Sequence, residues 1–439
     1  MGDNKAELKI QGSLEYNNAV IEADFYGYTN NLDGWNLFSL PINPLNISQD
    51  TIGQVYFNTG NNDDLYYWQE DYTDTSNLGR WVNYKSIPGG SGDFFKTQRG
   101  YLVSYNQNKK LEFEGRINDS ASYTLLDNAS LSLPNSERGW HLCANPYPFT
   151  LSIDNFNRTN VSNPSLLDPH TLNYTTLDVT DPTNYKIPPY SGFFVQVANQ
   201  TNNLSLTKEG NGSKTTINPS NFIEIKLISD LGEDKTKVLF IQGTSYGFDV
   251  EYDNRKLEGY GNISEIATIF NNENYSINAI EDFEDSIKVD LKFTVKVSGV
   301  HSIKLNIKEI QEYNKVLLYD KTTNTILNDF IIDSLFSTNL SNGEYENYQL
   351  IIKKQNSSIP NEEISQKTNI RIEKDGDKVE VFLDGGINEE ILSLELINTK
   401  GQVINKNTKS NWIILPEKGI YIIRVITNKN QFNRKITLI

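Results

Sequence analysis

Residues with the chemistry of an enzyme active site are few in this chain of 439 residues. The histidines are His141, His170 and His301, the one cysteine is Cys143, and their spacing fits no metal site. The sequence contains no nucleophile elbow, phosphate-binding loop or dinucleotide fingerprint. His141 and Cys143 would share one face of a strand, but an internal repeat replaces them with asparagine and phenylalanine in its first copy. We therefore interpret Cys143 as a small buried hydrophobe, and expect any catalysis to lie in an N-terminal part outside this chain.

An aromatic cluster offers a second kind of chemistry. Tyr66, Tyr67, Trp68, Trp81 and Tyr84 occupy a segment with the pattern of a hairpin. Tyr66, Trp68 and Trp81 could line an exposed face and stack on sugar rings, which would make this a glycan-binding site. The alternative is that these rings form sandwich core or cross-strand pairs. The sequence leaves both interpretations open.

Acidic and amide side chains gather in the same region, in the run Asn61-Asn62-Asp63-Asp64 and at Asp71 and Asp74. Oxygen ligands of this kind could bind Ca²⁺. Polar residues are equally typical of a loop near a turn. We expect no obligatory cofactor.

Composition excludes several classes of partner. The net charge of −16 disfavours nucleic acids and anionic membranes, because binding phosphates requires a basic surface. Hydrophobic residues make up 37%, enough for real cores, and a single cysteine rules out a disulfide within the chain. No signal-peptide pattern follows Met1, and no apolar run approaches the ~20 residues of a membrane span. We expect this sequence to be the C-terminal piece of a longer protein.

The elements that must position these residues are strands. Runs of alternating apolar and polar residues, rich in Ile, Val, Tyr, Phe and Thr, are separated by clusters of Asn, Gly, Asp and Ser. The best helix candidate is residues 264–270. The pattern predicts an all-β protein of tandem β-sandwich domains, jelly-roll or Ig-like, ending in a small seven-stranded Ig-like sandwich.

An internal repeat organises the first half of the chain. Gly34-Trp35-Asn36-Leu37 recurs as Gly139-Trp140-His141-Leu142. Residues 8–12 match 111–115, and residues 99–103 match 191–195. The shorter second copy places a deletion in its middle, where residues 172–174 would stand for 65–68. We expect the Gly-Trp motif to begin a central strand with its tryptophan in the core.

Five segments follow from these patterns. They are a β-sandwich repeat at 1–110, a second repeat at 111–212, a third β-sandwich module at 213–354, a polar linker at 355–367 and a C-terminal domain at 368–439. The last segment carries eleven Lys and Arg against nine Asp and Glu, so its charge is opposite in sign to that of the rest. It contains seven short strand patterns, which fits a small Ig-like sandwich.

The C-terminal segment resembles the type IX C-terminal sorting domain of secreted Bacteroidetes proteins. Three blocks carry the resemblance, at residues 394–404, 415–425 and 434–436. Glycines in the first two are expected at tight turns. The apolar run in the second is expected to be buried on both faces or bound by a partner. The residues that match the signal are Gly401, Leu415, Pro416, Gly419, Tyr421, Ile423, Val425 and Lys435.

The rest of the chain is similar to modules found beside such a tag. The paired Gly-Trp and Asn-Pro motifs resemble repeats of large secreted surface proteins, although the first copy departs from the pattern at residues 40–44. Residues 252–257, 276–279 and 318–321 resemble a module that often precedes the sorting domain.

The resemblance implies a secreted cell-surface protein that is exported across the outer membrane. Its partners would be the type IX translocon, an outer-membrane β-barrel carrier and a sortase-like peptidase that cleaves near residues 356–368. The alternative is an assembly of carbohydrate-binding or adhesin modules, of which the C-terminal segment is one more Ig-like member.

Overall fold

The protein is described from a computed structural model and divides into two compact units, Met1–Ser357 and Ser358–Ile439. The division falls within the segment expected to be a linker, which itself lies outside the described residues. The structure describes residues 19–28, 34–40, 42–43, 51–52, 55–56, 64–71, 79–86, 96–118, 121–125, 135–198, 201–208, 221–245, 247–283, 285–354, 369–384, 390–399, 401–408, 410–428 and 431–438. Strands dominate these residues, as the alternating sequence pattern predicts, and the all-β fold class is confirmed.

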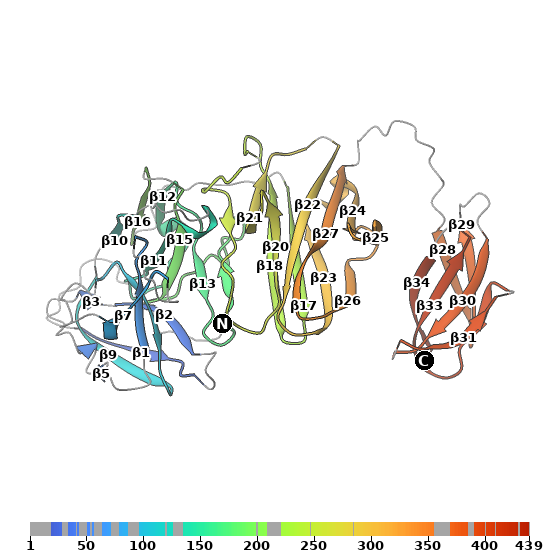
Figure 1. Cartoon of the computed structure of the whole chain (residues 1–439), viewed down its shortest axis with the longest axis horizontal. Helices are drawn as coiled ribbons and strands as arrows, with labels where there is room; N and C mark the ends of the chain where they lie inside the picture. The colour runs from blue at the N-terminus through green and yellow to red at the C-terminus, as the bar shows by residue number, and fades with distance from the viewer. Residues whose placement is uncertain are drawn as a thin grey trace. The chain divides into compact units, whose positions relative to one another are not determined.

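Module 1 opens the first unit with two facing sheets and a separate pair, β4-β5 (Figure 1). One sheet has the order β1-β9-β3 and the other β2-β8-β6-β7. Alternate residues of β9, Leu111 and Phe113, and of β8, Tyr101 and Val103, fill the core between the sheets. Its elements are β1 (Ala19–Phe25), β2 (Trp35–Ser39), β3 (Ile42–Asn43), β4 (Thr51–Ile52), β5 (Val55–Tyr56), β6 (Asp64–Trp68), β7 (Trp81–Asn83), the 3₁₀ turn η1 (Tyr84–Ser86), β8 (Gly100–Ser104) and β9 (Lys109–Ile117).

Module 2 repeats this topology. Its sheets, β10-β16-β12 and β11-β15-β13-β14, correspond strand for strand to those of module 1. The connection between β6 and β7 spans residues 69–80, whereas that between β13 and β14 spans only 168–173, so the second copy is shortened there. Its elements are β10 (Ala121–Tyr123), η2 (Asn135–Glu137), β11 (Trp140–Ala144), η3 (Ile153–Asn155), β12 (Phe156–Thr159), β13 (Ser165–Leu167), β14 (Tyr174–Thr176), β15 (Gly192–Gln196) and β16 (Asn203–Leu206).

Three expectations about the repeat need correction. The boundary between residues 110 and 111 falls inside β9, which pairs with β1 and β3 and so completes module 1. By topology the counterpart of β6 is β13, not residues 172–174. The Gly-Trp motif begins an edge strand in each copy, because β2 and β11 each pair with a single strand of their own sheet. Trp140 is buried, whereas Trp35 is half-buried. Residues 8–12, the proposed match of 111–115, lie outside the described residues.

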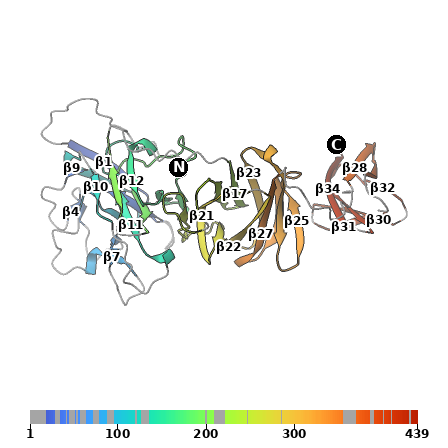
Figure 2. The ribbon, with the colours of Figure 1, turned by 90° about the horizontal axis from the view of Figure 1, so that it is seen from above.

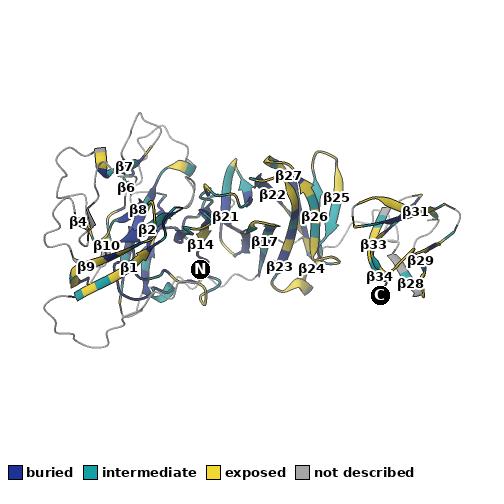
Figure 3. Cartoon of the chain, turned by 90° about the horizontal axis from the view of Figure 1, so that it is seen from below, coloured by how far each residue is buried: buried dark blue, intermediate teal, exposed yellow. Residues whose placement is uncertain are grey.

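Module 3 is built on one ladder of eleven strands, β25-β24-β27-β22-β20-β21-β18-β17-β23-β26 with β19 on β21. The ladder folds over on itself, so that β17 and β23 lie across the core from β22 and β27 (Figure 2). Buried and exposed residues alternate along these strands (Figure 3). Its elements are β17 (Asn221–Ser229), β18 (Gly232–Phe240), β19 (Asn254–Arg255), β20 (Glu265–Phe270), β21 (Glu273–Ile280), β22 (Ser286–Val295), β23 (Gly299–Ile307), η4 (Ile310–Glu312), β24 (Tyr313–Asp320), β25 (Thr325–Asp329), β26 (Leu335–Leu340) and β27 (Gly343–Lys354).

The helix candidate at 264–270 was wrong, because these residues form β20. This strand pairs with β21 on one side and β22 on the other. Ile266, Ala267 and Thr268 are all buried, since an interior strand with both faces covered has no solvent side. A short run that is apolar on every face looks alike in a buried helix and a buried strand.

Module 4 is the second compact unit, and its described residues form seven strands in two sheets, β28-β29-β32 and β31-β30-β33-β34. The number of strands and their positions agree with the sequence pattern. Its own core contains Val379, Leu394, Leu396, Ile413 and Ile423 among others. The strands are β28 (Asn369–Asp375), β29 (Lys378–Asp384), β30 (Ile391–Ile397), β31 (Val403–Asn407), β32 (Trp412–Ile414), β33 (Gly419–Thr427) and β34 (Gln431–Leu438).

Candidate functional site

The residues matched to the sorting signal gather around β33 of module 4. Tyr421, Ile423 and Val425 alternate along this strand and point into the core, with 6%, 0% and 0% of their surface exposed. Leu415, just before the strand, is buried beside them, and its backbone N–H donates to the carbonyl of Asp377. Four of the eight signal residues therefore lie in the core of the unit.

The other face of β33 is open to solvent within this chain. Ile420 and Ile422 are 45% and 40% exposed. Ile422 pairs with Ile397 of β30, and Val403 of β31, 49% exposed, pairs with Ile397 from the other side. Directly paired residues project from the same face of a sheet. We call Ile397, Val403, Ile420 and Ile422 the outer strip.

Charged residues border the outer strip. Lys435 pairs with Ile422 and is exposed. On β30 the carboxylate of Glu395 bonds Lys406 at 2.7 Å and Arg424 at 3.1 Å. The bond from Lys406 is the main cause that lowers the pKa of Glu395, so this carboxylate stays ionised. Only the inner face of β33 is buried, so of the two expectations for its apolar run, burial on both faces fails within this chain.

The two glycines of the signal serve different purposes. Gly401 has φ +77°, the left-handed backbone expected at a tight turn, and its own N–H donates to the carbonyl of Asn398. Gly419 begins β33 with ordinary extended geometry. A Cβ at Gly419 would lie 3.2 Å from the hydroxyl oxygen of Tyr421, so the absent side chain makes room for that ring. Pro416 is exposed.

The aromatic cluster of module 1 packs against module 2. Trp68 lies edge-on to Trp81 at 5.2 Å between ring centroids and to Phe194 of module 2 at 5.6 Å. The indole N–H of Trp68 donates to the carbonyl of Trp140 at 2.7 Å. Tyr66 lies two residues before Trp68 on β6, and its ring centroid is 6.4 Å from that of Trp81. The structure thus brings the three predicted residues together, with the indoles of Trp68 and Trp81 turned towards module 2.

The contact between modules 1 and 2 has an approximate two-fold symmetry that the sequence repeat did not reveal. Phe38 of β2 forms a bridge with Ser191, and its counterpart Cys143 of β11 forms one with Arg99, the counterpart of Ser191. The residues after these partners are both glycine. A Cβ at Gly100 would lie 2.5 Å from the carbonyl oxygen of Cys143, and one at Gly192 would lie 3.2 Å from that of Phe38. The sequence did hold a sign of this contact, the glycine in the matching pairs Arg99-Gly100 and Ser191-Gly192. Glycine in a strand often marks a close approach of another backbone.

The contact between modules 2 and 3 combines apolar packing with buried polar pairs, since Ile241 and Tyr252 of module 3 pack against the core of module 2. Asn254 of module 3 bonds the backbone of Asn163 twice, accepting from its N–H at 3.1 Å and donating to its carbonyl at 2.7 Å. Lys237 of β18 forms an ion pair with Asp178 of module 2. The guanidinium of Arg255 donates to the amide oxygen of Gln196 of module 2 at 3.3 Å.

A polar cleft of about 160 Å³ opens along this contact. Its lining is rich in charged and hydroxyl side chains, contributed mostly by β14, β17, β18 and β21. They include Asp178, Glu224, Asp234, Lys237 and Lys256.

Asp253, in the segment that docks on module 2, is an unusual carboxyl group. It is fully buried and accepts the backbone N–H groups of Asp249 and Ala279 at 2.7 and 2.6 Å. Burial raises its pKa to about 7, against the opposing effect of those two hydrogen bonds. Residues 252–257 belong to the segment that resembles a module found before the sorting domain, but the sequence pattern predicted no role for Asp253.

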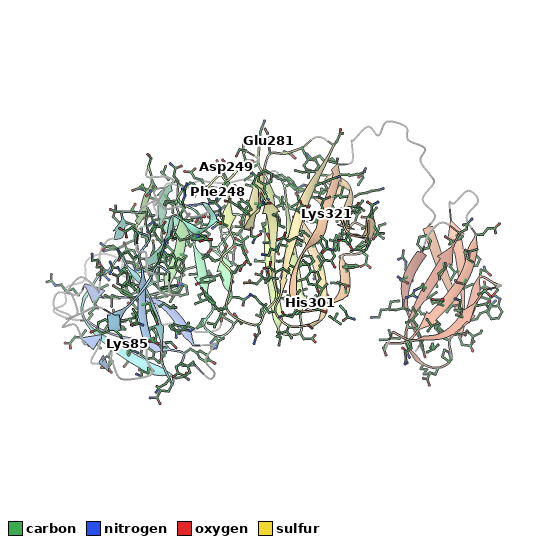
Figure 4. All side chains as sticks on the ribbon, in the orientation of Figure 1. Lys85, Phe248, Asp249, Glu281, His301 and Lys321 are labelled. Atoms are coloured by element: carbon green, nitrogen blue, oxygen red, sulfur yellow. The ribbon has the colours of Figure 1, made fainter. Side chains whose placement is uncertain are left out.

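His170 and His301 lie away from His141 and Cys143, which share strand β11. Cys143 is buried in the core of module 2, and burial raises the pKa of its thiol. His170 packs on Tyr26 at 4.1 Å, and His301 is buried with its Nε2 at 2.9 Å from the hydroxyl oxygen of Ser264. His301 lies towards the end of module 3 opposite to Asp249 (Figure 4).

The calcium prediction remains open. Residues 61–63 and Asp74 lie outside the described residues, while Asp64 forms an ion pair with Lys85 at 2.9 Å and Asp71 accepts from Gln69. Within the described ranges, no group of three or more His, Cys, Asp or Glu is placed to hold a metal ion. No helix in the part of the chain that the structure describes combines the length and apolarity needed to cross a membrane.

Comparison with known proteins adds no relative. No protein-family model matches this chain, and no curated protein matches it. Its function is therefore argued from its own residues and from the resemblance of its C-terminal segment.

Proposed function

We propose that this chain is the C-terminal region of a secreted bacterial cell-surface protein, and that residues 368–439 are its type IX sorting domain. The proposal rests on the resemblance at residues 394–404, 415–425 and 434–436. The observation that favours it most is the separate compact unit with a core of its own that contains these residues. A tag that is recognised and then removed must fold without help from its passenger.

The outer strip gives this unit a surface suited to binding a partner. Exposed Ile420, Ile422 and Val403 lie on one sheet face, beside the exposed Lys435. Contiguous apolar surface of this kind is typical of a binding face. In the proposed function its partner is the outer-membrane β-barrel carrier, and a sortase-like peptidase cleaves the preceding linker.

Modules 1 to 3 would be the passenger, carried to the cell surface as one body. Their mutual contacts bury polar and aromatic side chains and belong to one compact unit. No observation favours the glycan-binding alternative at Tyr66, Trp68 and Trp81, since Trp68 and Trp81 pack against module 2.

Deletion of residues 368–439 tests the proposal in a bacterium with a type IX translocon. We expect modules 1 to 3 to accumulate in the periplasm and to be lost from the surface and the medium. Normal export of the truncated chain would overturn the proposal.

A pair of surface variants refines the test. Ile420→Asn together with Ile422→Asn changes only exposed side chains of the outer strip, and we expect it to reduce export several-fold. Trp412→Asn is the matched control, because Trp412 is 37% exposed on the other sheet of the same unit. Equal export of both variants would show that the outer strip is not the recognised face.

A further inference from the structure

Lys256 and Asp234 form a buried ion pair beside the polar cleft of module 3. The ammonium nitrogen of Lys256 lies 2.6 Å from Oδ2 of Asp234, and their side chains are only 5% and 9% exposed. Asp234 belongs to β18, and Lys256 directly follows β19. A nitrogen at this distance from a carboxylate oxygen lies roughly 3–3.5 Å from the carboxyl carbon, the separation of a near-attack arrangement.

A third acidic residue completes the cluster. Glu265 is 3% exposed and is close enough to feel the charges of both Lys256 and Asp234. One of its oxygens accepts the N–H of Gly259 at 2.7 Å, while Oε2 has no hydrogen-bond partner and the ammonium of Lys296 lies 3.8 Å away. Burial raises the pKa of Glu265, so this carboxyl group holds a proton more readily than an exposed one.

A backbone donor is already aimed at the carboxyl group of Asp234. The N–H of Ile266, next to Glu265, donates to Oδ2 of Asp234 at 2.8 Å. A fixed N–H at this position would stabilise negative charge that develops on that oxygen. Amine, carboxyl group, proton carrier and oxyanion donor thus stand together in a site largely closed to solvent.

We propose that Lys256 and Asp234 become joined by an intramolecular isopeptide bond, with Glu265 as the group that transfers protons. The bond would tie the segment that docks on module 2 to the central strand β18. A chain whose single cysteine excludes a disulfide would gain a covalent staple in this way.

The reaction balances without a co-reactant. The Lys256 ammonium gives a proton to the Asp234 carboxylate, which produces a neutral amine and a carboxylic acid. The amine attacks the carboxyl carbon, a C–N bond forms, and the carbonyl electron pair moves to the oxygen held by the N–H of Ile266. Glu265 takes a proton from the new nitrogen and gives one to the departing hydroxyl. The C–O bond breaks and one water molecule leaves.

The surroundings favour the neutral product. A buried ion pair carries a desolvation cost of several kcal/mol per ion, which an uncharged amide avoids. The adjoining cleft, whose lining includes both Asp234 and Lys256, offers the released water a way out.

The neighbouring pair of Lys237 and Asp178 is a natural comparison. It lines the same cleft, and the nearby acid Glu224 lies 3.7 Å from Lys237. Lys235 pairs with Glu224 at 3.3 Å, so this acid is held as a charged partner. We expect an ordinary ion pair there.

Intact-mass spectrometry of the unfolded full-length chain tests the proposal. We expect a mass lower by one water molecule than the sequence requires. Peptide mapping should then find one branched peptide that joins the segments of Asp234 and Lys256. The full sequence mass, with Lys256 open to trypsin after unfolding, would overturn the proposal.

Variants identify the reacting groups. Glu265→Gln and Lys256→Arg should restore the full sequence mass, and Asp234→Asn should lose ammonia in place of water, because an amide then supplies the leaving group. Lys237→Arg, at the comparison pair, should keep the loss of water. Loss of water that persists in Lys256→Arg, or a branched peptide at Lys237, would contradict the assignment, and circular dichroism confirms that each variant is folded.

Discussion

The two interfaces that hold modules 1 to 3 together are built from different chemistry. Modules 1 and 2 meet through backbone bridges, two glycines and edge-on aromatic rings, arranged with approximate two-fold symmetry. One buried carboxylate, that of Glu70, also accepts the N–H of Gly139 there. Modules 2 and 3 meet through buried amide, carboxyl and ammonium groups, beside apolar packing of Ile241 and Tyr252, with no such symmetry. The first interface is a consequence of duplication, since equivalent strands of the two copies contact each other. The second joins unlike modules, and specific polar pairs fix their register.

This difference predicts different sensitivities. The stability that packing contacts provide depends on side-chain volume and hardly on pH or salt. Buried polar groups are costly when one partner is removed, and buried carboxyl groups make stability depend on pH. Substitutions at the two interfaces can therefore break or sharpen the comparison.

The largest effect is expected at the amide of Asn254. Its side chain satisfies both the N–H and the carbonyl of Asn163, and both residues are fully buried. Asn254→Ala leaves two buried backbone groups without partners, so we expect a loss of about 4 kcal/mol in the free energy of unfolding. Urea unfolding measures it. A loss below about 1 kcal/mol would mean that water replaces the amide and that this interface does not depend on polar pairing.

The second effect is a dependence on pH at Asp253. Its pKa in the folded protein is about 7, above the ordinary value of 3.8, mainly because of burial. The folded state therefore binds a proton that the unfolded state has released between these two values. The stabilisation by this group is complete below pH 4 and is lost as the pH rises to 7, by about 3 kcal/mol.

The measurement is urea unfolding at a series of pH values. Asp253→Asn should flatten the dependence of the unfolding free energy on pH between pH 4 and 7. Asp178→Asn, which removes the carboxylate that pairs with Lys237 in the same contact, is the control. Glu265, whose pKa burial also raises, contributes a slope of the same sign that persists in both variants. An unchanged slope in Asp253→Asn would assign the pH dependence elsewhere.

The third effect compares the paired glycines of the first interface. A methyl group at Gly100 would come 2.5 Å from the carbonyl oxygen of Cys143, whereas one at Gly192 would come 3.2 Å from that of Phe38. We expect Gly100→Ala to cost about 2 kcal/mol and Gly192→Ala about half as much, both independent of pH. Thermal unfolding at two pH values measures both. Equal costs would mean that the two-fold symmetry is closer than the contacts indicate.

The smallest effect is expected at Trp68. Trp68→Phe keeps a ring against Phe194 but removes the indole N–H that bonds the carbonyl of Trp140. We expect a loss of about 1 kcal/mol, the usual net contribution of one hydrogen bond. Trp81→Phe is the control with a similar change in ring size.

The parts of the fold that could be predicted from the sequence are those that depend on local patterns of residues. Strand alternation is local, so the seven strands of module 4 could be predicted from it. The repeat motifs at Trp35 and Trp140 predicted a duplication, and the strand orders of modules 1 and 2 correspond.

What failed depended on partners distant in the sequence. Residues 111–115 resemble residues 8–12 but pair with β1, so the first module boundary was misplaced. The apolar run in β20 could not reveal that strands flank it on both sides. The sequence left open whether Trp68 and Trp81 stack on sugars or pack in a core, because only the tertiary structure places Phe194 beside them. The closeness of Lys256 to Asp234 is likewise a result of folding, since the rest of β18, the segment that follows it and β19 separate them in the chain.

The central claim is that the C-terminal unit carries the export signal by itself. The direct measurement is to fuse residues 358–439 to a monomeric periplasmic reporter in a bacterium with a type IX translocon, and to measure reporter protein at the cell surface and in the medium. The account predicts export of the fusion, and its retention in the periplasm when Ile420 and Ile422 are both changed to asparagine. A folded fusion that stays in the periplasm without those changes would contradict it.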